Sequence, residues 1–328
     1  MRANLVSDIL FIHPLRSSFV QRDIDILTER YSVKVFKYDK PRHLAPLLLD
    51  LMKCRLAFGW FALGYAYPMV KLGLARQRPS ILVAGGYDVE SVPQLKYGAM
   101  GDPTRRRRTT FALTHATRVL AVSRFTMGRV LHWSPRSRVE VLYHGFPLSS
   151  GVNASPRHDQ VVTVANVTRT NWRLKGLETL VRVARRMPET SFEIVGRIDE
   201  DPRLYAEPMP TNVHFRGWVE LPELFELYRT SKVYAQLSYV ESFGCALAEA
   251  MSTGCLPVAT SRGSLPEVVG DVGTLVPYGD VDLTEAAIRE QLATKISTRA
   301  ATRIQDQFPI SSRRRRLHAL VDELLSRS

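Results

Sequence analysis

Cysteine is scarce in this chain, and this scarcity limits the kinds of protein it can be. Three cysteines occur in 328 residues, Cys54, Cys245 and Cys255, and their spacing fits no metal site. An odd number argues against a disulfide framework, so a reducing cytosol is the simplest location. Apolar residues make up 45% of the chain, which excludes a disordered protein, and the length suffices for two domains.

Long hydrophobic segments are also scarce. The apolar run near the N-terminus is interrupted by Asp8 and has no small-residue cleavage site, so it predicts a first strand rather than a signal peptide. Residues 56–70 carry no charge, but this run is too short to cross a bilayer. Its glycine and proline indicate a buried strand, turn and helix. A shallow membrane contact through its aromatic residues is the alternative.

Acidic residues are too few to balance the basic ones. Lys and Arg number 45 and Asp and Glu 32, which gives a net charge of +13. Such a surplus attracts nucleic acid, anionic lipid or phosphorylated substrates. Two arginine runs, 105–108 and 313–316, contribute to it. Each run alone is best interpreted as a solvated helix face, and together they predict a basic surface.

Predicted strands and helices alternate along both halves of the chain, which favours two parallel sheets covered on both faces. Residues 148–159 are rich in Gly, Ser and Pro and are predicted to be a linker. We therefore expect domains at 1–150 and 151–310 and a final amphipathic helix within 311–328. The strands expected in the second domain are 161–167, 192–196, 213–217, 233–237, 256–260 and 273–276.

One stretch of the second domain, 233–260, predicts a strand, a loop, a helix and a second strand. The start of a helix offers unpaired N–H groups that suit a phosphate, and Gly244 lets a ligand approach the backbone. Glu241 lies at the carboxyl end of the strand, where open α/β sheets bind ligands. Glu249 is eight residues further, which in a helix would place both carboxylates on one side. Taken alone, the two glutamates favour a plainer interpretation, a helix-start charge and a solvated helix face.

The whole stretch resembles the signature of the retaining glycosyltransferases of the large family 4, which have the GT-B fold. The resemblance rests on Glu-(seven residues)-Glu, on Ser-Phe-Gly after the first glutamate, and on Glu-Ala-Met-(two residues)-Gly-Cys-Leu-Pro-Val. Further similar segments follow the family's order, and these are 175–180, 192–196 and 213–217. The resemblance covers about 161–284 and is weaker over the first 150 residues. It implies an α/β fold of two Rossmann-like parallel-sheet domains that face each other across a cleft, with the last helix crossing back to the first domain.

The resemblance also implies a function, a metal-independent retaining glycosyltransferase. Such an enzyme moves a sugar from a nucleotide-diphosphate-sugar donor to the hydroxyl of a glycan, lipid-linked or small-molecule acceptor. Glu241 should hold sugar hydroxyls and Glu249 the ribose hydroxyls, while Lys175 should neutralise the leaving diphosphate. The backbone beside the donor is expected at Ser242, Phe243 and Gly244. No enzyme nucleophile, metal or other cofactor is expected.

The family also places an arginine shortly before the lysine. Arg169 has suitable spacing, alignment by the strand end gives Asn166, and Arg173 is a third candidate. We prefer Arg169.

Two residues of the first domain are expected to line the cleft on the acceptor side. Ser18 follows the first strand, and capping of a helix by Ser17 or Ser18 is the alternative. Asp88 follows a Gly-Gly turn at the end of a strand, and capping of that turn is equally favoured. Many relatives carry a histidine near this position, so a histidine-based account does not transfer.

The expected partners are the nucleotide-sugar donor and a glycan or lipid-linked acceptor, with no nucleic acid. We expect a cytoplasmic protein, with peripheral contact to an anionic membrane face as a further expectation. One rival is a metal-dependent GT-A enzyme with Asp-x-Asp, for which the chain offers 23/25, 199/201 and 280/282. A second is an inactive GT-B protein that binds a nucleotide or carbohydrate. A nucleic-acid binder has only the charge in its favour.

Overall fold

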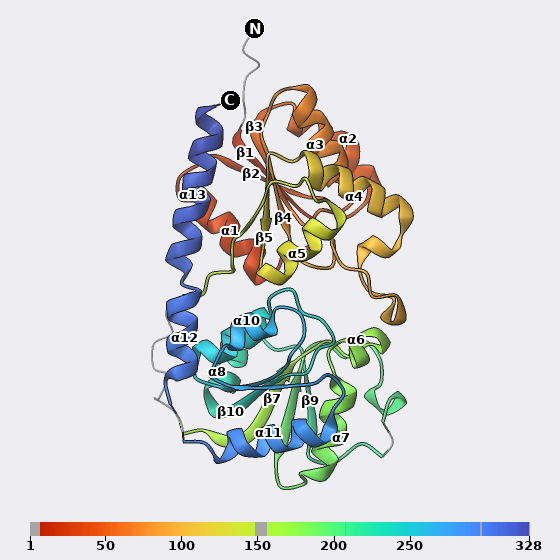
Figure 1. Cartoon of the computed structure of the whole chain (residues 1–328), viewed down its shortest axis with the longest axis vertical. Coiled ribbons are helices and arrows are strands. Elements are labelled where there is room, and N and C mark those ends of the chain that lie inside the picture. Colours follow the sequence, from red (N-terminus) through yellow and green to blue (C-terminus); the bar gives the residue numbers. More distant parts are fainter. Residues whose placement is uncertain (1–6, 148–155, 207, 296, 328) are drawn as a thin grey trace. The chain divides into compact units, whose positions relative to one another are not determined.

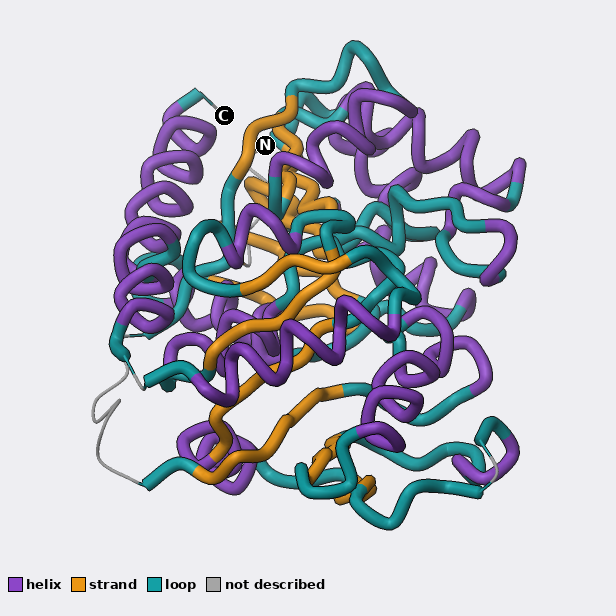
Figure 2. Tube along the Cα trace, turned by 60° about the horizontal axis from the view of Figure 1, so that its bottom comes forward, coloured by secondary structure: helices purple, strands orange, loops and turns teal. Residues whose placement is uncertain are grey.

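The computed structural model describes residues 7–147, 156–206, 208–295 and 297–327. The chain forms two compact units, Met1–Gly145 with Ser311–Ser328, and Phe146–Ile310. Each unit contains one six-stranded parallel sheet between helices (Figures 1 and 2). The α/β class predicted from the alternation of elements is thereby confirmed. Most of the predicted linker, 148–155, lies outside the described residues.

The sheet of unit 1 has the strand order β2-β1-β3-β4-β5-β6. The neighbouring interior strands β1 and β3 are buried almost throughout, and the rings of Phe11 and Phe58 stack with centroids 5.0 Å apart. Burial on both faces explains why these strands are continuous apolar runs. The strands are β1 Ser7–His13, β2 Val33–Lys37, β3 Cys54–Trp60, β4 Ser80–Ala84, β5 Arg118–Ala121 and β6 Val139–Val141.

Helices cover both faces of this sheet. Figure 1 shows α1 and α13 on one face and α2, α3 and α4 on the other. The helices are α1 Ser18–Thr28, α2 Leu44–Leu51, α3 Ala66–Ala75, α4 Pro103–His115, α5 Arg124–Trp133 and α13 Ile310–Ser326. The run 56–70 is therefore a strand, a turn and the start of a helix, as predicted.

A buried ion pair attaches α13 to unit 1. The Arg313 guanidinium donates from Nε and Nη2 to the two carboxylate oxygens of Asp23 on α1, at 2.6 and 2.7 Å. Its Nη1 donates to the carbonyls of Leu142 and Tyr143, both at 2.8 Å, and Trp60 Nε1 donates to Asp23 at 2.8 Å. The prediction that 313–316 is a solvated face is therefore wrong for Arg313. Its partner lies 290 residues away, where local sequence patterns cannot reveal it.

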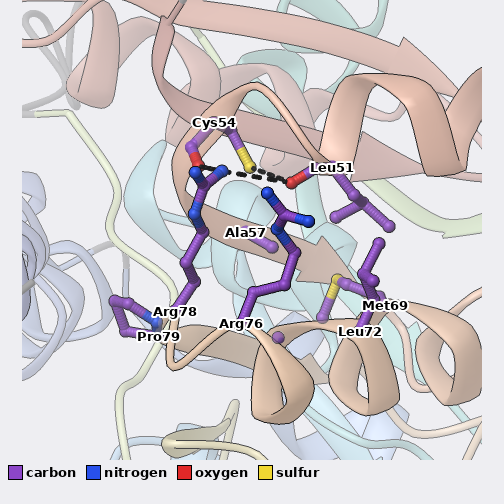
Figure 3. Close-up of a pocket in the computed structure, with 9 residues that line it drawn as sticks. Leu51, Cys54, Ala57, Met69, Leu72, Arg76, Arg78 and Pro79 are labelled. Carbon is purple, nitrogen blue, oxygen red and sulfur yellow. Dashed lines mark hydrogen bonds between the residues drawn. The ribbon is translucent and has the colours of Figure 1, made fainter. Parts of the chain in front are cut away.

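A second arginine joins the segments at the other end of the sheet. Arg78 Nη1 donates to the carbonyl of Met52 at 2.9 Å and also reaches the carbonyls of Leu51 and Cys54 (Figure 3). It thereby satisfies carbonyl groups where α2 ends and β3 begins. Burial raises the pKa of the Cys54 thiol to about 11, so this cysteine serves packing.

The sheet of unit 2 has the order β12-β11-β10-β7-β8-β9. The strands are β7 His158–Val164, β8 Ser191–Val195, β9 Val213–Gly217, β10 Ser231–Gln236, β11 Leu256–Thr260 and β12 Thr274–Val276. The helices are α6 Arg169–Leu174, α7 Leu177–Arg186, α8 Leu221–Thr230, α9 Cys245–Ser252, α10 Leu265–Val269, α11 Val281–Ala293 and α12 Arg299–Gln307. Strand β7 begins earlier than predicted, because polar residues at its start still pair with β8 and β10.

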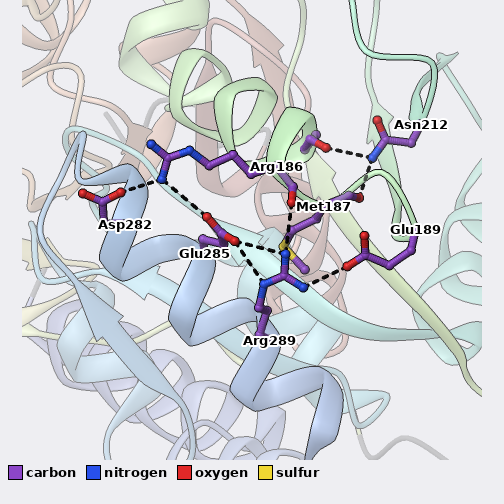
Figure 4. Close-up of polar contacts among 8 residues, drawn as sticks. Arg186, Met187, Glu189, Asn212, Asp282, Glu285 and Arg289 are labelled. Carbon is purple, nitrogen blue, oxygen red and sulfur yellow. Dashed lines mark hydrogen bonds and ion pairs between the residues drawn. The ribbon is translucent and has the colours of Figure 1, made fainter.

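Surface ion pairs join α7 to α11 in unit 2. Arg186 reaches Asp282 at 2.5 Å, and Arg289 reaches Glu285 and Glu189 at 3.0 and 2.8 Å (Figure 4). These pairs are exposed, so solvent screens them and each contributes little to stability. The packing of the two helices on the apolar core of the unit supplies the larger part.

Candidate active site

The stretch that dominates the sequence forms β10, a loop, α9 and β11. The loop 237–244 leaves the carboxyl end of β10, and α9 begins at Cys245. Gly244 takes the N-cap position with φ of +88°, a conformation that favours glycine. The N–H groups of the first turn of α9 have no partner within the helix and are directed past its start. This is the local geometry expected for binding an anion.

Glu241 lies in this loop and is held by three donors. Its Oε1 accepts Lys175 Nζ at 2.5 Å, Ser238 Oγ at 3.0 Å and Gln236 Nε2 at 3.2 Å. The side chains of Glu241 and Lys175 are 15% and 28% exposed, so the ion pair is partly open to solvent. A fixed carboxylate beside a fixed ammonium can bind hydroxyl groups and phosphate oxygens together.

Lys175 reaches Glu241 because the backbone around it is tied to the end of β10. Lys175 lies between α6 and α7, and Gly176 follows with φ of +70°. A Cβ atom on Gly176 would meet the Leu237 carbonyl oxygen at 2.0 Å, so only glycine allows this approach. Tyr239 N donates to the Leu174 carbonyl at 2.8 Å. The segment 175–180, which resembles the family's Lys-Gly helix start, does not open directly as a helix at Lys175. Instead, α6 precedes it as a separate short helix.

A buried polar chain supports the site from below. Tyr234 Oη donates to Gln236 Oε1 at 3.2 Å, and Gln236 Nε2 donates to Ser238 Oγ at 2.8 Å and to Glu241. Burial raises the pKa of Tyr234 well above its ordinary value, which keeps its hydroxyl proton in place. Sequence reasoning missed Gln236 and Ser238. The signal was a glutamine within an otherwise apolar buried strand.

The loop after β11 fixes the backbone of Glu241. Ser264 donates to the Glu241 carbonyl from N at 3.0 Å and from Oγ at 3.1 Å. Gly263 has φ of +61°, and a Cβ there would lie 2.3 Å from the same carbonyl oxygen. Arg262 stacks over Tyr239 at 3.9 Å from the ring centroid and donates from Nε to its carbonyl. The position of Glu241 is therefore determined from both β10 and β11.

Glu249 lies on α9 and is 6% exposed, so it is not the solvated helix face that two glutamates alone suggested. Burial raises the pKa of Tyr228, and the charge of Glu249 adds to that shift, so the two groups lie near each other. The helical-spacing argument for Glu241 and Glu249 is wrong, because α9 begins only at Cys245. The ribose contact of Glu249 stays a prediction.

The other residues predicted beside the donor differ in burial. Ser242 is half-buried in the loop. Phe243 is 2% exposed, and its ring packs on Phe146 and Phe308 with centroids 5.9 and 5.2 Å away. The Phe243 side chain is therefore part of the core, and only its backbone is placed to meet a ligand.

Among the arginine candidates, Arg169 is the first residue of α6. Its side chain is exposed and makes no ion pair with any described residue. Asn166 Oδ1 accepts Arg197 N at 3.0 Å, which is a loop-forming contact. Arg173 is exposed and lies 3.8 Å from Glu178. Arg169 retains the freedom to meet a ligand, and its role stays a prediction.

Ser18 and Asp88 belong to unit 1. Ser18 is half-buried and begins α1, and Ser17 at the N-cap makes no side-chain capping bond. Asp88 is wholly buried. It accepts the backbone N–H groups of Ala62, Gly85 and Gly86 at 2.7, 3.1 and 2.8 Å. Burial raises the pKa of Asp88 to about 6. These contacts are those of the turn-forming alternative, and an acceptor contact stays a prediction.

No group of three or more His, Cys, Asp and Glu side chains within the described ranges is arranged to hold a metal ion. Across those same ranges, no helix combines the length and apolar character needed to cross a bilayer.

Two units, each with a six-stranded parallel sheet, and a polar site at the strand ends of the second define a GT-B protein. The sucrose-phosphate synthase of Thermosynechococcus elongatus superimposes with a TM-score of 0.76 at 18% identity, over 98% of this chain and 99% of that one. The Anabaena HepE structure with UDP and glucose gives 0.73 at 16% identity, over 96% and 99%.

Sequence comparison identifies the family more closely. Residues 159–294 match the model of the glycosyl transferases group 1 family. The phosphatidyl-myo-inositol mannosyltransferase of Mycolicibacterium smegmatis is 34% identical over 137 residues, which are 39% of this chain and 36% of that protein. Residues 159–294 therefore belong to the glycosyl transferases group 1 family, and the chain as a whole has the GT-B fold. The segments over which this chain matches its curated relatives cover less than half the length of each of those proteins.

Proposed function

We propose that this protein is a retaining glycosyltransferase that needs no metal. It transfers a sugar from a nucleotide-diphosphate-sugar donor to the hydroxyl of a glycan, lipid-linked or small-molecule acceptor. The observation that carries the proposal is the partly open Lys175–Glu241 pair, 2.5 Å apart, beside the start of α9. The similar proteins support the substrate class, since one is a mannosyltransferase and the structure of another contains UDP and glucose.

The roles follow from charge and hydrogen-bonding capacity. Lys175 would donate to the diphosphate as the glycosidic bond breaks, with the N–H groups at the start of α9 and the Arg169 guanidinium as further donors. Glu241 would accept hydrogen bonds from hydroxyl groups of the sugar. The hydrogen bonds from Lys175, Ser238 and Gln236 hold its carboxylate in place before the nucleotide-sugar binds. Glu249 would accept the ribose hydroxyls. In other enzymes, removal of one hydrogen-bond donor that stabilises a developing negative charge lowers turnover by about 100-fold to 1,000-fold.

The retaining outcome requires that the acceptor hydroxyl attacks the sugar from the same face that the leaving diphosphate departs. No enzyme nucleophile is therefore assigned. Contact of the protein with an anionic membrane surface at the cytoplasmic face belongs to the same proposal, because the acceptor class includes lipid-linked sugars. Transfer would then take place where the acceptor is anchored.

Donor turnover tests the proposal. Release of nucleotide from UDP-, GDP- and ADP-sugars is measured with EDTA present, for wild type and for the variants Glu241→Ala and Lys175→Ala. We expect slow release from one donor in wild type, which both variants lose. Glu290→Ala removes an exposed glutamate of α11 and should behave as wild type.

Two results would contradict the proposal. Loss of wild-type turnover in EDTA would favour metal-dependent chemistry. Binding of a donor without turnover, across a wide set of acceptors, would favour the inactive binding protein.

A further inference from the structure

The excess positive charge of the chain lies entirely in unit 1. Unit 1 has 28 Lys and Arg against 12 Asp and Glu, a net charge of +16. Unit 2 has 17 against 20, a net charge of −3, and together the units give the +13 of the chain. A positive surplus on unit 1 is not needed to bind a nucleotide in unit 2. It indicates a second, anionic partner for unit 1.

The two arginine runs of unit 1 differ in what neutralises them. In the run 313–316, Arg313 is buried against Asp23, Arg314 pairs with Glu29 at 3.0 Å, and Arg316 pairs with Glu140. In the run 105–108 all four side chains are exposed, and none pairs with an acidic side chain among the described residues. Figure 1 shows α13 and α4 on opposite faces of the sheet. Of the two runs, the one on α4 is therefore the run without acidic partners.

The position of these arginines within α4 works against folding. The helix begins at Pro103, and Asp102 at the N-cap accepts Arg105 N at 2.7 Å. Arg105 and Arg106 thus complete the first turn and Arg107 and Arg108 begin the second, and the first turn contains no acidic side chain. Cations near the positive end of a helix dipole are mildly destabilising. Such a local conflict is expected where a surface serves binding.

Aromatic side chains lie among the cations of this face. Phe111 on α4 packs on Tyr67 of α3 with centroids 5.0 Å apart, and Lys71 lies 5.7 Å above the Tyr67 ring. Arg106 lies 5.7 Å above the ring of Trp133, the last residue of α5. All three rings are half-buried. Half-buried aromatic rings between Lys and Arg are typical of surfaces that lie in the interface of a bilayer.

We propose that this face, hereafter the α4 face, docks on a membrane surface of anionic phospholipid. It comprises Arg105–Arg108 with Lys71, Tyr67, Phe111 and Trp133. The proposal rests on the proposed function in one respect, which is that a lipid-linked acceptor would be reached there. The α4 face makes an electrostatic and interfacial contact, without insertion of a helix, and its strength depends on the charge of the lipid.

Vesicle binding tests the α4 face. The full-length protein is sedimented with vesicles of phosphatidylcholine alone and of phosphatidylcholine with phosphatidylserine. We expect binding only to the anionic vesicles, with loss at high salt. The variant Arg105→Ser/Arg107→Ser/Arg108→Ser should bind roughly 100-fold more weakly at low salt, about fivefold per arginine. Arg106 is kept because it packs on Trp133.

A matched variant removes the same charge elsewhere. Lys53, Arg182 and Lys295 are exposed cations without an ion pair to any described residue, and their triple serine variant should bind vesicles nearly as wild type does. The arginine variant should unfold at the same temperature as wild type or slightly higher, because it relieves the helix dipole.

Four outcomes would overturn the proposal: equal binding to neutral and anionic vesicles, wild-type binding by the arginine variant, equal loss in the matched variant, or binding to heparin and to neither kind of vesicle. Donor turnover without vesicles should be unchanged in the arginine variant. Absence of turnover in wild type would count against the proposed function alone.

Discussion

Asp23 in unit 1 and Glu241 in unit 2 each face a cation, but their surroundings differ. Asp23 and Arg313 are wholly or nearly wholly buried, and Trp60 and two backbone carbonyls take the remaining hydrogen bonds. Glu241 and Lys175 are partly exposed at the strand ends, and Lys175 has donors to spare. The first pair can only hold the fold, while the second can exchange its partners for a ligand. Burial and unused bonding capacity separate a structural ion pair from a binding site.

Removal of the buried cation should have the largest effect on stability. Arg313→Met leaves Asp23 charged without its partner, which should lower the free energy of unfolding by about 3–5 kcal/mol. Lys175→Met is the matched change at the open pair and should cost about 1 kcal/mol or less. Chemical denaturation of both variants measures the difference. Equal losses would remove the distinction between the two pairs.

Adding Asp23→Asn to Arg313→Met should recover part of the lost stability, because it removes the unpaired buried charge. No recovery in the double variant would mean that the arginine acts through packing.

A smaller effect should appear in the pH dependence of stability. Burial raises the pKa of Asp88 to about 6, so the folded state binds its proton more tightly than the unfolded state, whose carboxyl titrates near 4. The contribution of Asp88 is therefore complete below about pH 4 and is lost as the pH rises through about 6, a change of about 3 kcal/mol.

Asp88→Asn lacks this titration, so its stability should fall furthest below that of wild type near pH 4 and approach it at pH 7. Denaturation at several pH values measures the difference. A difference that stays constant over this window would show that Asp88 is ionised throughout.

Most of the architecture could be predicted from the sequence, because buried parallel strands are apolar runs that alternate with helices. The strands 213–217 and 256–260 were predicted at their observed bounds. The errors in the predicted elements occur where the local sequence lacks a clear strand or helix pattern. Strand β7 starts with polar residues, and α6 is a short helix inserted before Lys175.

The site was predicted by resemblance more than by local physics. The structure brings Lys175 and Glu241 together across 66 residues, and no local pattern contains that contact. Gly176 and Gly263 make the approach feasible, but their role depends on backbone segments that meet only in the fold. The same limitation applies to Asp23. In the sequence it is only part of an Asp-x-Asp spacing, which gives no sign of its partner Arg313.

The central claim is that Lys175 binds the diphosphate and Glu241 binds the sugar, and binding of a nucleoside diphosphate without a sugar tests it most directly. The dissociation constants of UDP, GDP and ADP are measured by calorimetry for wild type, Lys175→Gln and Glu241→Gln. Lys175→Gln should weaken binding of the preferred nucleotide. Glu241→Gln should strengthen it, because the carboxylate no longer competes for the Lys175 ammonium or repels phosphate. Weaker binding in both variants, or no change in either, would contradict the account.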